Sequence, residues 1–315
     1  MTKKIAFIFP GQGSQAVGMG KDIYENYAEA KNIYDTADKV LDKSVTKLCF
    51  EGPEDDLKLT VNTQPCIVTT SIAMMEALRS ELNIIPDYVA GHSLGEYCAM
   101  FTAVLISLET TLKLIQKRAD LMGQTKGGGM AAVLNANEDV LKAGLEEGRK
   151  IGYVDVANYN SPAQVVITGD EGAVKAAGDY ILANGARRVV PLAVSGAFHS
   201  KFMQEAGAIL GEFIQDAELN DSSIPVITNV DAELTITAED FRAKMPKQIY
   251  SSVHWTQTIQ KMVEEGVDTF VEIGPGKVLA GLNKKIAPDA AVYNVYDKTS
   301  LDATVAALKE QMAEV

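Results

Sequence analysis

The chain has 315 residues, of which 47% are hydrophobic and 23% charged, and its 29 basic and 42 acidic side chains give a formal net charge of −13. A chain of this length buries roughly 75% of its unfolded surface, so we expect one or two domains that fold without disulfides or metals. The composition excludes a disordered chain, and the net charge opposes extended contact with nucleic acid or with an anionic membrane.

Cysteine and histidine usage predicts neither a disulfide framework nor a metal cluster. The chain has three cysteines, none in a CxxC motif, and three histidines. The first apolar run ends at Pro10 and is too short for a signal sequence. The longest apolar run, at 98–106, is about half of what a bilayer span needs. Together these features predict a cytoplasmic protein.

Hydrophobic spacing predicts alternating strands and helices in the first part of the chain. The short apolar runs at 5–9 and 88–90 indicate buried strands. The first of these runs ends at a Pro-Gly pair, which is a turn signal. Apolar residues at helical spacing predict helices at 22–41, 63–82, 94–105 and 108–124.

A run of three glycines at 127–129 precedes a different pattern. Strands are expected next at 130–134, 153–158, 164–168 and 188–194, with helices at 138–148 and 171–184. This β-α-β-β-α-β order is the split βαβ unit of a ferredoxin-like subdomain. Afterwards the pattern predicts helices at 199–217, 239–250, 255–265 and from 302, and strands at 225–229, 268–273 and 291–295. We therefore expect an α/β core at 1–126 and 196–315, interrupted by a ferredoxin-like α+β insert at 127–195.

The strongest motif is Gly91-His92-Ser93-Leu94-Gly95, a GxSxG sequence between a predicted strand and a predicted helix. This context is typical of a nucleophile elbow, in which a sharp turn raises the serine hydroxyl above the sheet edge. The two glycines would leave room for the adjoining strand and helix. The first backbone N–H groups of the helix, beginning at Leu94, would face an oxyanion. A plain glycine-rich turn is the alternative.

A serine nucleophile needs a base, and each histidine is a candidate. Neighbours on a tight turn point their side chains apart, so we interpret His92 as a structural or pocket-lining residue. His254 precedes Trp255 and is interpreted as a half-buried side chain. His199 lies on a strand-to-helix loop, which can reach another such loop at the same sheet edge. His199 is therefore the favoured base, with a satisfied structural histidine as the alternative.

Two further features have competing interpretations. The loop at 10–16 fits the G-x-G-x-x-A dinucleotide fingerprint. However, Gly18 and Gly20 follow where a Rossmann helix should run, and Asp35 lies within a helical pattern and not at the end of a strand. The loop could instead supply N–H donors beside the elbow. Arg118 borders the apolar stripe of a predicted helix, where arginine usually extends to solvent.

Several motifs occur in one order along the chain: FPGQGSQ at 9–15, GHSLGEY at 91–97, QKR at 116–118, NYNSPAQVVI at 158–167, GAFHS at 196–200, NVD at 229–231 and VEIGPGKVL at 271–279. Together they resemble the malonyl-CoA:acyl carrier protein transacylases of fatty acid synthesis and the related acyltransferase domains of polyketide synthases. The resemblance covers essentially the whole chain. It implies an α/β-hydrolase-like core with an inserted ferredoxin-like α+β subdomain.

The resemblance also implies a reaction, namely transfer of the malonyl group of malonyl-CoA to the phosphopantetheine thiol of acyl carrier protein. Ser93 would form the malonyl-serine intermediate, and His199 would take its proton. Gln248 would orient His199 through its backbone carbonyl, which fixes the tautomer without an acidic third residue. The backbone N–H groups of Gln12 and Leu94 would form the oxyanion hole.

Substrate-binding roles follow from the same resemblance. Arg118 would hold the free malonyl carboxylate in a bidentate pair that lysine cannot copy. The other residues expected to line the substrate site are His92, Met122, Phe198 and Asn160. The aromatic ring of Phe198 would crowd a branched α-carbon, which predicts weak use of methylmalonyl-CoA. No cofactor or metal is expected, since coenzyme A is a product, and we expect a monomer.

Two other functions stay open on the sequence. An acyl hydrolase would use Ser93 and His199 with water as the acceptor, and a binding module would retain the scaffold with a decayed site. The negative net charge also has to be reconciled with two acidic partners, coenzyme A and the carrier protein. The stretches 180–204 and 273–288 contain no acidic residue, and we expect their basic residues to form a positive rim around the cleft: Arg187, Arg188, Lys201, Lys277, Lys284 and Lys285.

Overall fold

The computed structural model describes residues 3–194 and 196–313 and contains two sheets. The larger sheet has the strand order β10-β9-β1-β2-β7-β8. Its neighbouring strands pair in parallel except for β7 and β8, which are antiparallel. These strands are β1 (Lys4–Phe9), β2 (Tyr88–Gly91), β7 (Val226–Ile227), β8 (Leu234–Thr235), β9 (Val267–Ile273) and β10 (Ala291–Val295).

Helices cover both faces of this sheet because successive side chains of a strand point to opposite faces. Phe7 of β1 packs in a core cluster with residues of α2, α5 and α7. Ile8 packs in a second cluster with Trp255 of α12 and Leu279 of α13. The sheet is therefore buried on both faces, as parallel sheets usually are. Within the described residues, no helix has the length and the hydropathy to cross a membrane.

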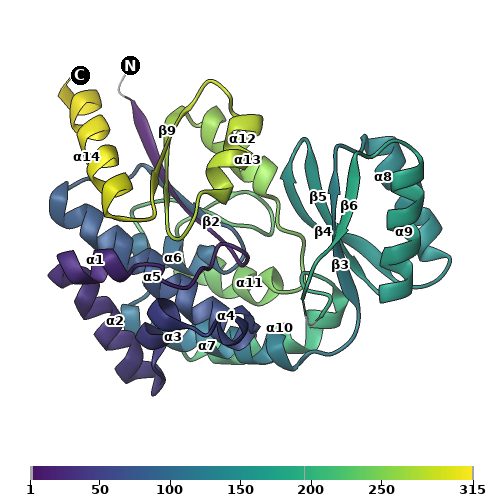
Figure 1. The fold of residues 1–315 in the computed structure, drawn as a ribbon, viewed down its shortest axis with the longest axis horizontal. Coiled ribbons are helices and arrows are strands. Elements are labelled where there is room, and N and C mark those ends of the chain that lie inside the picture. Colours follow the sequence, from purple (N-terminus) through teal and green to yellow (C-terminus); the bar gives the residue numbers. More distant parts are fainter. Residues whose placement is uncertain (1–2, 195, 314–315) are drawn as a thin grey trace.

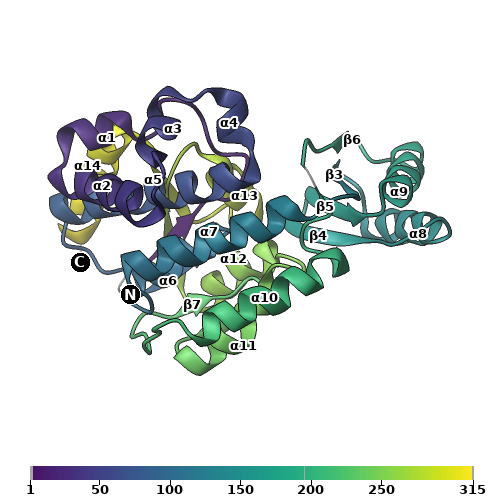
Figure 2. The same ribbon diagram turned by 90° about the horizontal axis from the view of Figure 1, so that it is seen from below.

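The helices around the larger sheet come from both ends of the chain (Figure 1). The first group is α1 (Lys21–Asn26), α2 (Ala28–Leu41), α3 (Val45–Glu51), α4 (Glu54–Lys58), α5 (Thr60–Glu81), α6 (Gly95–Thr102) and α7 (Leu108–Gln124). The second group is α10 (Gln204–Gln215), α11 (Ala238–Gln248), α12 (Trp255–Glu264), α13 (Val278–Ile286) and α14 (Lys298–Ala313). Figure 2 shows α7 and α10 running side by side toward the smaller sheet.

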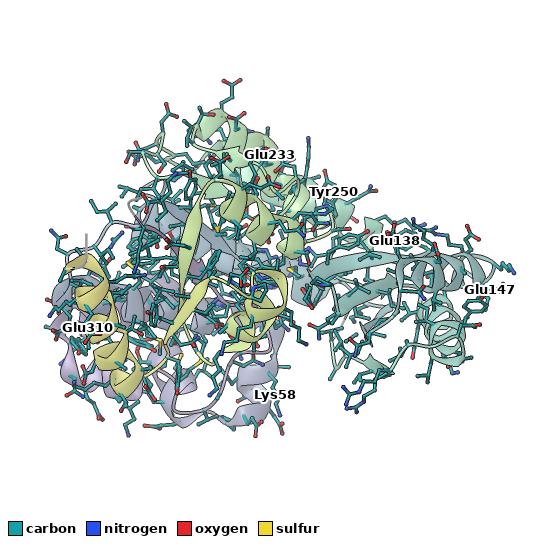
Figure 3. All side chains as sticks on the ribbon, turned by 90° about the horizontal axis from the view of Figure 1, so that it is seen from above. Lys58, Glu138, Glu147, Glu233, Tyr250 and Glu310 are labelled. Carbon is teal, nitrogen blue, oxygen red and sulfur yellow. The ribbon has the colours of Figure 1, made fainter. Side chains whose placement is uncertain are left out.

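The smaller sheet is antiparallel, with the order β4-β5-β3-β6. Its elements are β3 (Gly129–Leu134), α8 (Glu138–Arg149), β4 (Val154–Ser161), β5 (Gln164–Gly169), α9 (Glu171–Ala183) and β6 (Arg188–Pro191). This topology is ferredoxin-like and confirms the predicted fold class. The unit has its own apolar cluster, which includes Val133 and Ile181. Figure 3 shows it at one end of the molecule, with Glu147 near its outer tip and Glu310 of α14 at the opposite end.

The smaller unit meets the core where the chain crosses between them. Gly127 and Gly196 form an isolated bridge, so the entering and leaving segments lie together. Val253, just before α12, exchanges backbone hydrogen bonds with Ala157 and Tyr159 of β4. The expected insert limits, 127–195, stay a prediction, and Ser195 lies outside the described residues.

Several predicted boundaries were wrong for local reasons. The helix expected at 22–41 is broken at Tyr27, whose backbone is extended. The strand expected at 188–194 ends at Pro191. The helix expected at 199–217 begins only with the 3₁₀ turn η1 (Lys201–Met203), because His199 has a φ of +54°.

Other elements were displaced or not predicted. The last helix begins at Lys298 and not at residue 302, because the Asp297 carboxylate accepts a hydrogen bond from Ser300 N and caps the first turn. The short helices α3 and α4, the strand β8 and the helix α13 were not predicted. In α13, the buried Glu272 carboxylate accepts hydrogen bonds from Leu279 N and Ala280 N, a cap supplied from seven to eight residues away in the chain.

The strand order determines where the loops of interest meet. β1, β2 and β7 run parallel, with β2 in the middle, so their carboxyl ends lie at one edge of the sheet. Ligand sites of open α/β sheets usually lie at this edge. Gln12 follows β1, Ser93 follows β2 and Asn229 follows β7. Residues separated by more than 200 positions in the sequence are thereby brought to one place.

Replacement of Gly95 by alanine tests how closely the start of α6 packs against the end of β1. A Cβ at Gly95 would lie 2.3 Å from the Phe9 carbonyl oxygen, so the strand or the helix must shift. We expect Gly95→Ala to lower the free energy of unfolding by about 2–3 kcal/mol or more in urea titrations. The matched control is Gly281→Ala, where nothing lies within 4 Å of the new methyl group in a helix. It should raise stability by up to about 1 kcal/mol. Wild-type stability of Gly95→Ala would contradict this account.

Candidate active site

The elbow around Ser93 is a strained turn that only small flanking residues allow. Ser93 has a φ of +53°, in the left-handed region that non-glycine residues rarely adopt. A Cβ on Gly91 would lie 1.9 Å from the carbonyl carbon of Gly95. The two glycines therefore let β2 and α6 approach each other. As predicted, the turn lies between a strand and a helix.

Asn229 holds both sides of this turn from the neighbouring strand. Its Oδ1 accepts a hydrogen bond from Ser93 N at 2.8 Å, and its Nδ2 donates to the Gly91 carbonyl at 2.7 Å. Its own backbone N–H donates to Glu96 Oε2 at 3.2 Å. Strained backbone persists where its surroundings hold it in this way. The sequence marked Asn229 only as part of a motif, without a role.

His199 meets the Ser93 hydroxyl. The Oγ of Ser93 lies 2.8 Å from His199 Nε2. The other ring nitrogen, Nδ1, lies 3.0 Å from the carbonyl oxygen of Gln248 and 3.1 Å from that of Ser251. Carbonyl oxygens only accept, so Nδ1 carries the proton and Nε2 is left as an acceptor. Ser251 is a second backbone acceptor that sequence reasoning missed.

The environment of His199 keeps its ring neutral. Burial, the positive charge of Arg118 and the neighbouring His92 together lower the pKa of His199 to about 3. The two carbonyl acceptors favour the charged form and oppose this shift. At neutral pH the ring therefore presents an unprotonated Nε2 to the serine hydroxyl.

Arg118 lies on the other side of the same hydroxyl. Its side chain is fully buried, which rules out the solvent-exposed position that residues of this type usually take beside an apolar stripe. Its Nη2 donates to Ser93 Oγ at 2.9 Å and to Gln248 Oε1 at 3.1 Å, and its Nη1 donates to Gln64 Oε1 at 2.6 Å. Gln64 was also missed by sequence reasoning. A buried cation held only by neutral acceptors is suited to binding an anion.

A cavity of about 110 Å³ opens onto these groups. Gln12 and Leu94, the expected oxyanion-hole residues, line it together with Met122 and Phe198. Met122 also accepts a hydrogen bond from Gln64 Nε2 at 3.2 Å through its sulfur. The structure thus brings the loop after β1, the elbow, α7 and the segment before η1 to one cavity.

Asn160 faces a second cavity, of about 150 Å³, which shares Gln12 and His92 with the first. His92 Nε2 lies 2.8 Å from Asn160 Oδ1, so the imidazole donates there. The His92 ring is therefore directed to the cavity wall and not to Ser93, in line with the pocket-lining interpretation. His254 is half-buried and stacks on the Tyr159 ring, with centroids 5.3 Å apart.

The loop at 10–16 packs against the elbow. A Cβ on Gly11 would lie 2.8 Å from the His92 carbonyl oxygen, so this loop needs glycine for close approach. Asp35 lies inside α2, and the next strand of the described chain, β2, begins only at Tyr88. The second strand therefore begins too far along the chain for Asp35 to lie at its end, which contradicts that alternative.

The three cysteines, Cys49, Cys66 and Cys98, are buried free thiols. Within residues 3–194 and 196–313, no three side chains of the His, Cys, Asp and Glu types are grouped so as to hold a metal ion. The groups that meet at the site are a serine hydroxyl, a neutral imidazole and a guanidinium.

Comparison with known proteins agrees with this arrangement. The family described as acyl transferase domain matches residues 6–307. The malonyl CoA-acyl carrier protein transacylase of Bacillus subtilis is 41% identical over 312 residues, which covers 98% of each chain. The crystal structure of the malonyl CoA-acyl carrier protein transacylase of Clostridium perfringens matches with a TM-score of 0.93 at 37% identity, covering 99% of this chain and 100% of that one.

A malonyl-transacylase solved in complex with a type II PKS acyl-carrier protein also matches, with a TM-score of 0.93 at 34% identity, covering 96% of this chain and 99% of the other. Family, sequence and structure comparisons extend over nearly the whole chain and agree with one another. The chain therefore belongs to the acyl transferase domain family and, within it, to the malonyl CoA-acyl carrier protein transacylases.

Proposed function

We propose that this protein transfers the malonyl group from malonyl-CoA to the phosphopantetheine thiol of an acyl carrier protein, for fatty acid or polyketide synthesis. The observation that carries the proposal is the position of Ser93 Oγ, 2.8 Å from a neutral base and 2.9 Å from a buried guanidinium. The first group activates the hydroxyl, and the second matches the carboxylate that distinguishes malonyl from acetyl.

The first half-reaction forms the acyl-enzyme. His199 Nε2 takes the Ser93 proton while Oγ attacks the thioester carbonyl, and the backbone N–H groups of Gln12 and Leu94 stabilise the oxyanion. The C–S bond then breaks, and the proton passes from His199 to the coenzyme A thiolate. The Gln248 carbonyl keeps His199 in the required tautomer throughout.

The second half-reaction reverses these steps with another thiol. The phosphopantetheine thiol gives its proton to His199 and attacks the ester, and Ser93 recovers the proton as the new thioester leaves. Each half-reaction balances without an oxidant, reductant or cofactor. Coenzyme A is therefore a product that leaves before the carrier protein reacts, which is a ping-pong mechanism.

The two cavities suggest how the substrate lies. The malonyl carboxylate would pair with Arg118 beside Met122, and the thioester arm would pass His92 and Asn160 in the second cavity. Phe198 borders the small first cavity, where its ring would crowd a methyl branch on the α-carbon. We accordingly expect malonyl-CoA to be used much better than methylmalonyl-CoA.

The remaining expectations are part of this proposal. Buried unpaired thiols fit the cytoplasm, where thiols stay reduced. A monomer is expected because all the proposed catalytic groups come from one chain. No nucleic-acid or membrane partner is expected, and the proposed chemistry uses no cofactor or metal.

A covalent adduct tests the proposed nucleophile directly. Intact-protein mass spectrometry after mixing with malonyl-CoA should show one malonyl group, and peptide mapping should place it on Ser93. Addition of carrier protein bearing phosphopantetheine should remove the adduct and produce malonyl-carrier protein. Ser93→Ala should form none.

Failure to form any adduct would favour a binding module with an inactive site. An adduct that decays to malonate as fast without carrier protein as with it would favour a hydrolase. Both outcomes contradict the proposed transfer, and the Ser93→Ala control shows that the signal comes from the elbow.

The low pKa of His199 predicts an unusual pH profile. Since its pKa is lowered to about 3, the base stays neutral when the pH falls from 7 to 5.5. Labelling of Ser93 by an uncharged fluorophosphonate should thus change little over this range. A histidine with an ordinary pKa of about 6.5 would lose about eight-fold in its neutral fraction, and that result would contradict the account.

Two other buried groups of this cluster titrate: burial raises the pKa of Glu96 to about 7 and lowers the pKa of His92. The same profile is therefore measured with Glu96→Gln and with His92→Gln. An inflection near pH 7 that disappears in the first variant belongs to Glu96, and one that disappears in the second belongs to His92. A fall that persists in both variants belongs to His199 and contradicts the prediction.

Basic residues lie on α13, one of the elements that line the second cavity. Lys284 and Lys285 are exposed on the last turn of α13, whose residues Leu279 and Leu282 line this cavity. Lys277 is exposed at the start of the same helix. An acidic carrier protein would be attracted to this surface despite the net charge of −13.

Charge reversal tests this surface. Lys284→Glu with Lys285→Glu should raise the KM for carrier protein, most clearly at low salt where screening is weakest. The KM for malonyl-CoA and the rate of Ser93 acylation serve as internal controls. An unchanged KM for carrier protein would remove these two lysines from the docking surface.

A further inference from the structure

The side-chain amide of Gln248 is fully engaged inside the active site. Its Nε2 donates to the Ser93 carbonyl at 2.7 Å and to Glu96 Oε2 at 3.0 Å. Its Oε1 accepts from Arg118 Nη2 at 3.1 Å. Gln248 is buried, so it has no water to replace these partners. These contacts are separate from the backbone carbonyl that faces His199.

Only one orientation of this amide satisfies its neighbours. An amide rotated by 180° would place its oxygen against the Ser93 carbonyl and the Glu96 carboxylate, which are both acceptors. Its NH₂ group would then face the Arg118 guanidinium, which can only donate. Glu96 and the elbow carbonyl therefore determine that an oxygen points at Arg118.

The hydrogen bonds of Arg118 leave specific N–H groups for a ligand. Gln64 Oε1 occupies one N–H of Nη1, and Gln248 Oε1 occupies one of Nη2. The second N–H of Nη2 donates to Ser93 Oγ, whose lone pairs lose basicity when the serine is acylated. Two amide oxygens thus fix the guanidinium. Its Nε–H and one N–H of Nη1 have no hydrogen-bond partner in the described part of the chain, and the Nη2 N–H at Ser93 Oγ becomes available to a carboxylate once that contact is given up.

Glu96 is a buried carboxylate that contacts both the residue holding the Ser93 turn and the residue holding Arg118. Its Oε2 accepts from Asn229 N and from Gln248 Nε2, and its Oε1 has no hydrogen-bond partner in the described part of the chain. Burial raises its pKa to about 7. A carboxylate is costly to bury, and Glu96 lies buried beside Gln248, the residue that holds Arg118.

We propose that Glu96 and the side chain of Gln248 are positioning residues for Arg118, and that they thereby determine the preference for acyl groups bearing a carboxylate. This inference rests on the proposed malonyl transfer. In the chain of contacts, Glu96 orients the Gln248 amide, the amide holds Nη2 of Arg118, and the guanidinium is presented to the acyl group. Neither positioning residue needs to touch the substrate.

The decisive variant is Gln248→Met, which keeps the side-chain length and the backbone carbonyl but removes all three side-chain hydrogen bonds. The rate of Ser93 acylation by malonyl-CoA should fall about ten-fold or more, as expected for loss of a hydrogen bond to a charged group. Acylation by acetyl-CoA and labelling by a fluorophosphonate should fall less, so that the ratio of the malonyl to the acetyl acylation rate decreases. The matched control is Gln257→Met, the same replacement at an exposed position of α12.

Variants of Glu96 test the other half of the chain of contacts. Glu96→Leu removes the acceptor and should reproduce the loss of malonyl selectivity seen in Gln248→Met. Glu96→Gln keeps one oxygen in place for both donors and should recover most of that selectivity. Because both residues act through one contact, the double variant Glu96→Leu with Gln248→Met should be no worse than the poorer single variant.

Equal losses in malonyl acylation, acetyl acylation and fluorophosphonate labelling would overturn the proposal, because they indicate general damage to the site. Wild-type malonyl selectivity in Gln248→Met would overturn it as well, and so would a loss in Glu96→Gln as large as in Glu96→Leu. Thermal unfolding of each variant identifies a folding defect. If Gln248→Met or Glu96→Leu is defective, the ratio of malonyl to acetyl acylation in Glu96→Gln decides whether the proposal stands. If wild-type protein forms no malonyl adduct, the proposed function fails, which is distinguishable from all of these outcomes.

Discussion

The left-handed turn at Ser93 is the constraint on which the rest of the site depends. It presents the hydroxyl at the sheet edge, and it exists because Asn229 bonds the backbone on both sides of it. β1 and β7 flank β2, so one neighbour supplies the Gln12 loop and the other supplies Asn229. The glycines at 91 and 95 allow the backbones of β2, α6 and β1 to approach each other closely. A strained turn between two supporting strands therefore gives the nucleophile a fixed position.

Burial of the site determines the charges of the two side chains that contact this hydroxyl, Arg118 and His199. A guanidinium and an imidazole cannot both be charged at such short range in a poorly solvated site, and Arg118 keeps its proton far more strongly than His199. The imidazole is therefore neutral, and two backbone carbonyls set its tautomer in place of a carboxylate. Binding of an anionic acyl group would offset the charge of Arg118. Accepting the serine proton would then become easier for His199, and the proposed recognition of the acyl group and the strength of the proposed base would be coupled through Arg118.

The sequence predicted those features that have a local signature. The elbow has a fixed motif between a strand and a helix, and the insert has a β-α-β-β-α-β order; both were confirmed. His199 was favoured from its loop alone, and the structure brings it to Ser93. Arg118 could not be assigned from its helix, because its burial depends on Gln64 and Gln248, 54 and 130 positions away. Only the family resemblance indicated its role.

The sequence assigned no role to the supporting residues, although Asn229 and Glu96 lie within two of its motifs. Asn229, Glu96 and Ser251 act through contacts between distant segments, and most of these contacts involve backbone atoms, which carry no side-chain signature. The most direct test of the central claim is the fate of the malonyl-enzyme in a single turnover, followed with and without carrier protein. The account predicts an acyl-enzyme that persists alone and is consumed when phosphopantetheine-bearing carrier protein is added, with malonyl-carrier protein as the product. Release of free malonate at one rate, whether or not carrier protein is present, would contradict it.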